Sequence, residues 1–153
     1  MTTRYAESKV PAARHEWTQL IAATGNISTD RTSQAIACGW ARLAIVRIDL
    51  TGFTRTDANE TLDIFIQTTY NGGVDWADVE HIQRTTAGAA LRLVVIGMPQ
   101  SSATARIETA AALAANTKLD LPLGTHLRVV FDLTDPGGTA DTYAVNVEAF
   151  LQA

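Results

Sequence analysis

The sequence predicts an all-β fold, a single antiparallel β-sandwich, and three observations carry this prediction. Several segments alternate apolar and polar residues with a period of two, which is the pattern of half-buried strands. Turn-forming clusters separate these segments, among them Asn71-Gly72-Gly73 and Asp135-Pro136-Gly137-Gly138. The chain has 153 residues, which fits one domain with one core. Short strands punctuated by turns are typical of a sandwich or a barrel.

The alternation places the strands along the chain. We expect them at residues 16–21, 41–53, 61–70, 74–84, 91–98, 126–133 and 142–151. In the long second segment one face is wholly apolar and the other is mixed. Residues 103–116 are ambiguous, because their alanines favour a helix, whereas Thr104, Ile107 and Thr109 are β-branched. A strand, irregular structure and a short helix all stay open there.

The segment from Thr69 to Trp76 carries a recognisable turn motif. It resembles the Asp-box, Ser-x-Asp-x-Gly-x-x-Trp, of sialidases and other propeller proteins, with Asn71 in place of the aspartate. In those proteins the box is a folding element. The chain holds one copy and is too short for a propeller. We therefore expect a hairpin closure in which glycine supplies a positive φ and Trp76 packs beside the turn.

The composition argues against several partners. The net charge is −4, and the lysines and arginines are scattered, whereas nucleic-acid binders usually carry a basic stripe. No apolar run approaches the roughly 20 residues of a membrane span. Charged residues make up only 18% of the chain, below the usual quarter. Such a surface is easily desolvated, so it suits lasting contacts between protein subunits.

The single cysteine and the N-terminal residues indicate the cellular compartment in which the protein is made. Cys38 is the single cysteine, which excludes an intrachain disulfide and fits a reducing environment. The first residues lack the apolar segment of a signal peptide. We therefore expect synthesis in the cytoplasm, with the sequons at Asn26 and Asn59 unmodified.

No group of residues has the spacing of a catalytic, metal or cofactor site. Cys38 lies in an apolar stretch and is expected to be a buried structural residue. None of His15, His81 and His126 belongs to a motif, and we expect edge or surface positions for His81 and His126. The remaining metal candidates, Asp132, Asp135 and Asp141, flank a turn without the spacing of a calcium loop. We predict a protein that is not an enzyme and that needs no cofactor or metal.

The first 15 residues differ from the rest of the chain. They are polar and lack the periodicity of a strand or a helix. Pro11 favours an extended backbone before it. We predict an extended N-terminal arm at residues 1–15 and a β-sandwich domain at residues 16–153. The arm is expected to dock on a neighbouring subunit, with anchors at Arg4, Tyr5, Val10 and Arg14; an arm folded back over an edge strand of its own domain is the alternative.

Three stretches together resemble one family of viral proteins. They are residues 61–68 with the following Asn-Gly-Gly-x-x-Trp hairpin, residues 114–131, and the closing strand at 143–147. They are similar to the β-sandwich or jelly-roll proteins that decorate and cement the capsids of tailed bacteriophages. The resemblance covers about half the chain and implies a homotrimer that binds the major capsid protein on the exterior of the virion, without catalytic residues.

Two other classes of function stay open from the sequence. A carbohydrate- or protein-binding sandwich, such as a phage tail or neck component, would display aromatic residues on one face or groove. The chain has 7% aromatic residues, and Trp17, Trp40 and Trp76 are far apart along it. A small enzyme on a β-scaffold would need polar groups that converge in a pocket, and the sequence points to none.

Overall fold

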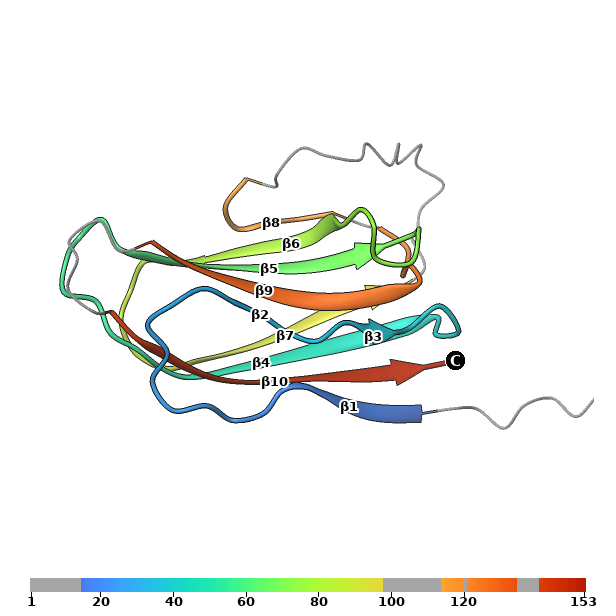
Figure 1. Cartoon of the computed structure of the whole chain (residues 1–153), viewed down its shortest axis with the longest axis horizontal. Helices are drawn as coiled ribbons and strands as arrows, with labels where there is room; N and C mark the ends of the chain where they lie inside the picture. Colours follow the sequence, from blue (N-terminus) through green and yellow to red (C-terminus); the bar gives the residue numbers. More distant parts are fainter. Residues whose placement is uncertain (1–14, 98–113, 120, 135–140) are drawn as a thin grey trace, which may run out of the picture.

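The computed structural model describes residues 15–97, 114–119, 121–134 and 141–153. Within these ranges the chain forms strands only, and they build two antiparallel sheets packed face to face (Figure 1). The strands are β1 (His15–Ile21), β2 (Arg31–Thr32), β3 (Ile36–Ala37), β4 (Leu43–Phe53), β5 (Thr61–Thr69), β6 (Ala77–Arg84), β7 (Ala90–Gly97), β8 (Thr117–Lys118), β9 (His126–Thr134) and β10 (Tyr143–Gln152).

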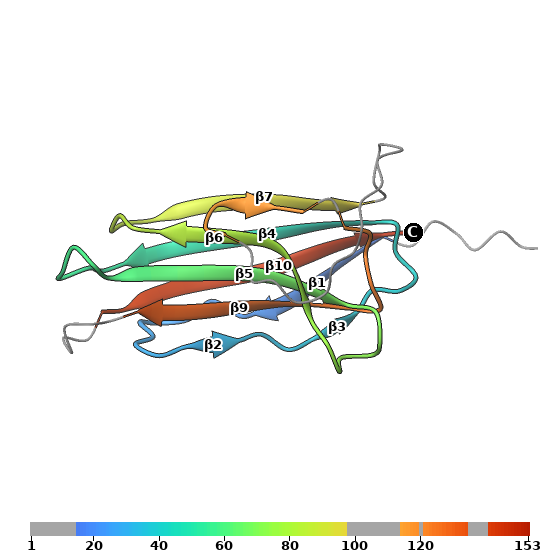
Figure 2. The same cartoon turned by 90° about the horizontal axis from the view of Figure 1, so that it is seen from above.

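The order of the strands defines the topology. Sheet A has the order β1-β10-β4-β7, and sheet B has the order β2-β9-β5-β6-β8, with β3 also paired to β9. Every pair is antiparallel. Figure 2 shows the two sheets from above, with β5, β6 and β9 of sheet B in front and the strands of sheet A behind them.

Strands from the first half of the chain pair with strands from the second half, as the two arms of a long hairpin do, and these pairs are distributed over two sheets. Strand β1 pairs with β10, β2 and β3 pair with β9, β4 pairs with β7, and β5 pairs with β6. The successive pairs alternate between sheet A and sheet B. This is the jelly-roll arrangement, two Greek keys wound together. The predicted fold class, an antiparallel jelly-roll-like β-sandwich, is confirmed.

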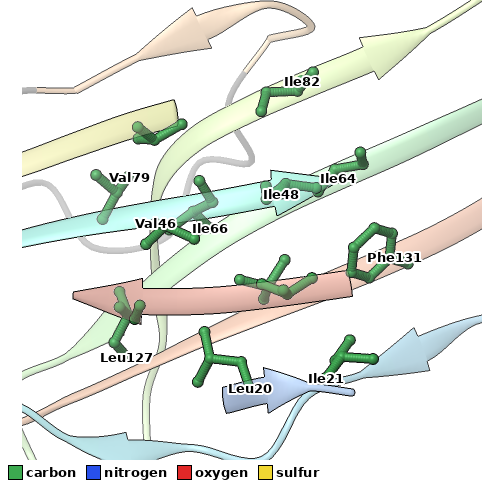
Figure 3. Packing of buried hydrophobic residues seen from close by; sticks show 14 of the residues in the cluster. Leu20, Ile21, Val46, Ile48, Ile64, Ile66, Val79, Ile82, Leu127 and Phe131 are labelled. Atoms are coloured by element: carbon green, nitrogen blue, oxygen red, sulfur yellow. The ribbon is translucent and has the colours of Figure 1, made fainter. Parts of the chain in front are cut away.

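The core fills the space between the sheets, because alternate side chains of each strand point inward. Strand β4 contributes Ala44, Val46, Ile48 and Leu50, each at most 2% exposed. Opposite them lie Ile64 and Ile66 of β5, Val79 and Ile82 of β6, and Leu127 and Phe131 of β9 (Figure 3). The ring of Phe131 stacks on Tyr143 of β10 at 5.4 Å between ring centroids. This contact joins the two sheets.

The hairpin motif folds as predicted. Thr69 Oγ1 contacts Asn71 Oδ1 at 2.8 Å and accepts the backbone N–H of Gly73 at 3.2 Å. The backbone φ angles of Gly72 and Gly73 are 74° and 101°, where only glycine is unstrained. Trp76 Nε1 donates to the carbonyl of Gly73 at 3.1 Å. The positive φ and the packing of Trp76 beside the turn are both confirmed.

The turn is longer than the alternation predicts. Asn71 Oδ1 accepts the N–H of Asp75 at 2.9 Å, and with the Trp76 bond this keeps residues 70–76 in the turn. Strand β6 therefore begins at Ala77 rather than at residue 74. Strands β2, β3 and β8 escape prediction because each has two residues, too few to show a period. Residues 103–113 of the ambiguous segment lie outside the described part of the chain.

One edge of sheet A is capped by a lysine from sheet B. Lys118 of β8 donates from Nζ to the carbonyl oxygen of Val95 on β7 at 2.6 Å. Among the described strands β7 pairs only with β4, and the backbone groups on the other side of such a strand can pair with an added strand. A lysine at such an edge satisfies one acceptor and opposes strand addition at that point.

Gly124 lies where the chain returns to the hairpin. Its N–H donates to Thr68 Oγ1 at 2.9 Å, and the N–H of Thr125 donates to the carbonyl of Thr69 at 2.7 Å. A methyl group on Gly124 would overlap that carbonyl oxygen. Both partners are backbone or fully buried, so the overlap is not relieved by rotating a side chain.

We expect Gly124→Ala to lower the free energy of unfolding by at least about 1–3 kcal/mol, the usual cost of overpacking. Urea unfolding followed by tryptophan fluorescence measures this. Gly25→Ala is the matched control, because no atom lies within 4 Å of its added methyl group and loss of chain entropy in the unfolded state stabilises it slightly. Equal stabilities of the two variants would contradict the close approach.

Candidate interaction surface

A row of four apolar side chains crosses the outer face of sheet A, one from each strand. Trp17 pairs with Phe150, Phe150 with Ile45, and Ile45 with Val95. The inward neighbours on β4, β7 and β10 are buried, so Ile45, Val95 and Phe150 point outward. The rings of Trp17 and Phe150 are in contact at 5.3 Å between centroids. Trp17 is 56% exposed, which is unusual for an indole in a folded domain.

Strand β7 extends this row along the edge of the sheet. Its side chains Leu91, Leu93 and Val95 are 58%, 59% and 48% exposed, whereas Val94 and Ile96 are buried. We define the apolar face as the outward side chains of the row and of β7: Trp17, Ile45, Leu91, Leu93, Val95 and Phe150. Contiguous exposed apolar groups of this kind mark interaction sites.

Charged residues lie next to the apolar row on the same face. Arg47 of β4 is paired across the sheet with Glu148 and Leu93. Its guanidinium contacts Glu148 at 3.3 Å and Asp49 at 3.2 Å. Half-exposed pairs of this kind contribute about 0–1 kcal/mol to stability. Their position gives the apolar face a polar border, which is the usual layout of a protein–protein interface.

The arm anchors predicted from the sequence lie outside the described residues. They are Arg4, Tyr5, Val10 and Arg14. The described chain begins with β1, one residue earlier than the predicted first strand. Strand β1, which carries Trp17, directly follows the residues predicted as an arm, and it lies at the edge of sheet A among the described strands. The sequence did not predict the apolar face, since an exposed apolar residue and a core residue look alike in an alternating strand.

Cys38 is a structural residue, as predicted. Its side chain is fully buried, and its thiol donates to the carbonyl of Gly124 at 3.4 Å. Burial raises the pKa of the thiol to about 11. A nucleophilic cysteine needs the opposite shift, because the thiolate is the reactive form.

The expected edge or surface position is wrong for His81. This residue is 8% exposed on the outer face of sheet B. It stacks on Phe65 at 4.2 Å, and its Nε2 lies 2.6 Å from Asp63 Oδ1. Gln83 also donates to Asp63, at 3.0 Å. The sequence misplaced His81 because the short β8 extends the sheet beyond β6. His126 is half-buried at the start of β9, and the side chain of His15 is outside the described set.

The aspartates near the last hairpin do not converge. Asp132 is exposed and Asp141 is fully buried, while Asp135 lies outside the described ranges. Among the described residues, no group of three or more His, Cys, Asp or Glu side chains is placed to hold a metal ion. The same part of the chain holds no helix long and apolar enough to cross a membrane.

A buried pair of carboxyl groups, which the sequence did not reveal, fixes the loop between β4 and β5. Glu60 and Asp141 are both fully buried, and the N–H of Thr56 donates to Glu60 at 2.6 Å and to Asp141 at 3.2 Å. Burial raises the pKa of Glu60, but hydrogen bonds from Asp141, Asp57 and Thr56 outweigh it, so the pKa is lowered overall. These contacts tie the loop to the start of β10.

Comparison with known proteins gives weak structural likenesses. No protein-family model matches the chain, and no curated protein matches it. A solved structure of broad bean stain virus is similar with a TM-score of 0.44 and 12% identity, over 99% of this chain and 94% of that chain. The VP2 subviral particle of infectious bursal disease virus gives 0.43 and 12%, over 99% of this chain and 37% of that chain. At such values the jelly-roll assignment rests on this chain's own strand order, and a shared architecture does not determine function.

Proposed function

We propose that this chain is a structural virion protein that assembles with other copies of itself through the apolar face of sheet A. The observation that carries the proposal is the apolar row of Trp17, Phe150, Ile45 and Val95, continued by Leu91 and Leu93. Burying exposed apolar surface is the main favourable term in association. The row spans all four strands, so a rigid sheet presents it without ordering cost.

The size of the face suits a contact between copies. Four strands about 4.8 Å apart and roughly eight paired residues long outline about 500 Å² in projection for the whole outer face of sheet A, which holds the apolar face and the charged residues beside it. Projecting side chains increase the accessible surface. The outer face of sheet A therefore approaches the size of a standard interface, which buries about 800 Å² per partner. Trp17 and Phe150 are the anchors, because aromatic side chains, tryptophan above all, are enriched among the residues that contribute most to binding.

Strand addition is a less suitable mode of assembly at β7. Lys118 already occupies the carbonyl oxygen of Val95 on the edge of sheet A. An approaching strand would have to displace this charged hydrogen bond. The face of the sheet remains accessible, since Leu91, Leu93 and Val95 point away from the core.

The finer proposal follows from the sequence resemblance. The chain is a decoration protein of a tailed-phage capsid, bound to the major capsid protein on the exterior of the virion as a homotrimer. In a cyclic trimer the three apolar faces surround one axis, and each copy contacts two neighbours with different parts of its face. The buried thiol of Cys38 and the stacked His81 support a structural rather than a catalytic role.

We expect Leu93→Asp to abolish self-association, because it places a carboxylate between Leu91 and Val95 on β7, and burying that carboxylate in the interface is costly. Sedimentation velocity of the purified chain should give about three times the subunit mass of 16.4 kDa for the wild type and the subunit mass for the variant. The control is Leu119→Asp, which places the same charge at a 41% exposed leucine next to β8. A wild-type chain that sediments as a monomer would remove the proposed trimer.

We expect capsids stripped of this protein to rupture at a lower temperature than decorated capsids. Subunits that bridge neighbouring capsomers stabilise the closed shell by linkage. Dye accessibility of the packaged genome on a temperature ramp gives the rupture point, and adding back the purified chain should restore it. Equal rupture temperatures would show that the protein coats the capsid without stabilising it. Failure of the chain to bind capsids would rule out decoration.

We expect deletion of residues 2–14 to weaken the oligomer or its attachment to the capsid while the domain stays folded. The core and β1 begin after this segment, so the melting temperature of the isolated subunit should change little. Sedimentation at several protein concentrations and co-pelleting with capsids measure the two effects. If the arm instead covers its own edge strand, the melting temperature falls while assembly is unchanged.

A further inference from the structure

A pocket of about 620 Å³ lies between the β5–β6 turn and the outer face of sheet B. Its lining includes Gln67, Tyr70, Asn71, Asp75, Trp76 and Arg128. Gln67 and Arg128 are a cross-strand pair of β5 and β9, and their sequence neighbours Ile66, Leu127 and Val129 are buried in the core. The two side chains therefore point outward, and the turn forms the opposite wall.

The floor of the pocket is held in place by its own contacts. Arg128 Nε donates to Gln67 Oε1 at 2.8 Å, and Gln67 Nε2 donates to Asp78 Oδ1 at 2.7 Å. The guanidinium carbon of Arg128 lies 4.0 Å from the ring centroid of Trp76. A stacked and hydrogen-bonded arginine loses little freedom when it binds a ligand. The pocket is thus preorganised without one.

Donor and acceptor groups in this pocket have hydrogen-bonding capacity left. In the described part of the chain, Arg128 uses only Nε, so its terminal nitrogens carry donors without a protein partner. Asp75 accepts from Asn71 Nδ2 through Oδ2 at 2.7 Å, and its Oδ1 has no described partner. Apolar surface lies beside them, since Tyr70 is 38% exposed and Val74 at the rim is 78% exposed.

We propose that this pocket binds a neutral saccharide. A pyranose ring presents hydroxyl groups that both donate and accept, next to an apolar C–H face. The pocket offers the complementary set: donors on Arg128, an acceptor on Asp75, and the exposed surfaces of Tyr70 and Val74. A few placed polar groups beside aromatic and apolar surface are typical of small-molecule sites.

The charges around the pocket favour a neutral ligand over an acidic one. Among the described lining residues Arg128 is the cation and Asp75 is the anion, and Asp78 accepts a hydrogen bond from Gln67 of the same lining. Asp75 offsets the charge of Arg128 within the pocket, and a ligand carboxylate would meet the repulsion of Asp75 at close range. Neutral hydroxyl groups make the same hydrogen bonds without that penalty.

The pocket and the apolar face lie on opposite sides of the sandwich, because one is on the outer face of sheet B and the other on the outer face of sheet A. If the proposed function is right, assembly through sheet A leaves the pocket accessible on the particle. The saccharide proposal does not depend on this, since the isolated chain carries the whole pocket.

The test uses the full chain and a panel of methyl glycosides of glucose, galactose, mannose and N-acetylglucosamine, with glucuronic acid as the acidic probe. Saturation-transfer difference NMR reports which of them contacts the protein. We expect binding of at least one neutral glycoside with a Kd on the order of 1 mM, typical of a ligand of this size. Arg128→Met keeps the apolar stem but removes the donors, and it should weaken binding at least tenfold.

Arg92→Met is the matched control, because Arg92 is an exposed arginine on β7 of the other sheet; it should bind as the wild type does. Melting curves of both variants verify that they are folded. Binding of glucuronic acid without any neutral glycoside would overturn the proposal, and so would a panel without binding or an Arg128→Met variant that binds normally. The Leu93→Asp monomer should retain saccharide binding, so failure of either proposal is seen independently of the other.

Discussion

The packing of sheet A against sheet B is the constraint on which the rest of this molecule depends. Each long strand has one set of apolar side chains that leaves water on folding, and in the described part of the chain the two sheets bury these sets against each other. Val46 and Ile48 of sheet A meet Ile64 and Ile66 of sheet B across the interior. A shift of one residue in any pairing would turn these side chains to solvent. The core therefore fixes the register of every long strand.

Once the register is fixed, the outward side chains are fixed as well. On sheet A they align Trp17, Phe150, Ile45 and Val95 in one row. On sheet B the same rule sets Arg128 beside Gln67 and places His81 next to Phe65. The two outer faces thus differ in chemistry: that of sheet A carries a contiguous row of exposed apolar side chains, and that of sheet B carries the polar pair of Arg128 and Gln67. A jelly-roll with two different faces can assemble through one and bind a ligand through the other.

The β5–β6 hairpin connects folding with the pocket. Its hydrogen bonds between Thr69, Asn71 and Gly73 close the turn, and this closure brings Trp76 under the guanidinium of Arg128. Its stem is also bonded to the chain at Gly124 and Thr125. Trp76 therefore both closes the turn and lines the pocket. For this reason Arg128→Met tests ligand binding more directly than a change at Trp76 would.

The sequence by itself determined the strands with a clear period, the positive φ of the glycine turn and the burial of Cys38, because these depend on local sterics and on the polarity of neighbouring residues. It did not determine strand order, since pairing depends on contacts far apart in the chain. The sequence also did not determine which side of β7 is buried, because Leu91, Leu93 and Val95 are as apolar as Val94 and Ile96. Only the tertiary structure shows that Val94 and Ile96 are the buried set. The apolar face, the buried His81 and the pocket beside Arg128 all follow from such choices. Each is made by residues from different strands, whose proximity is a property of the fold and not of the local sequence.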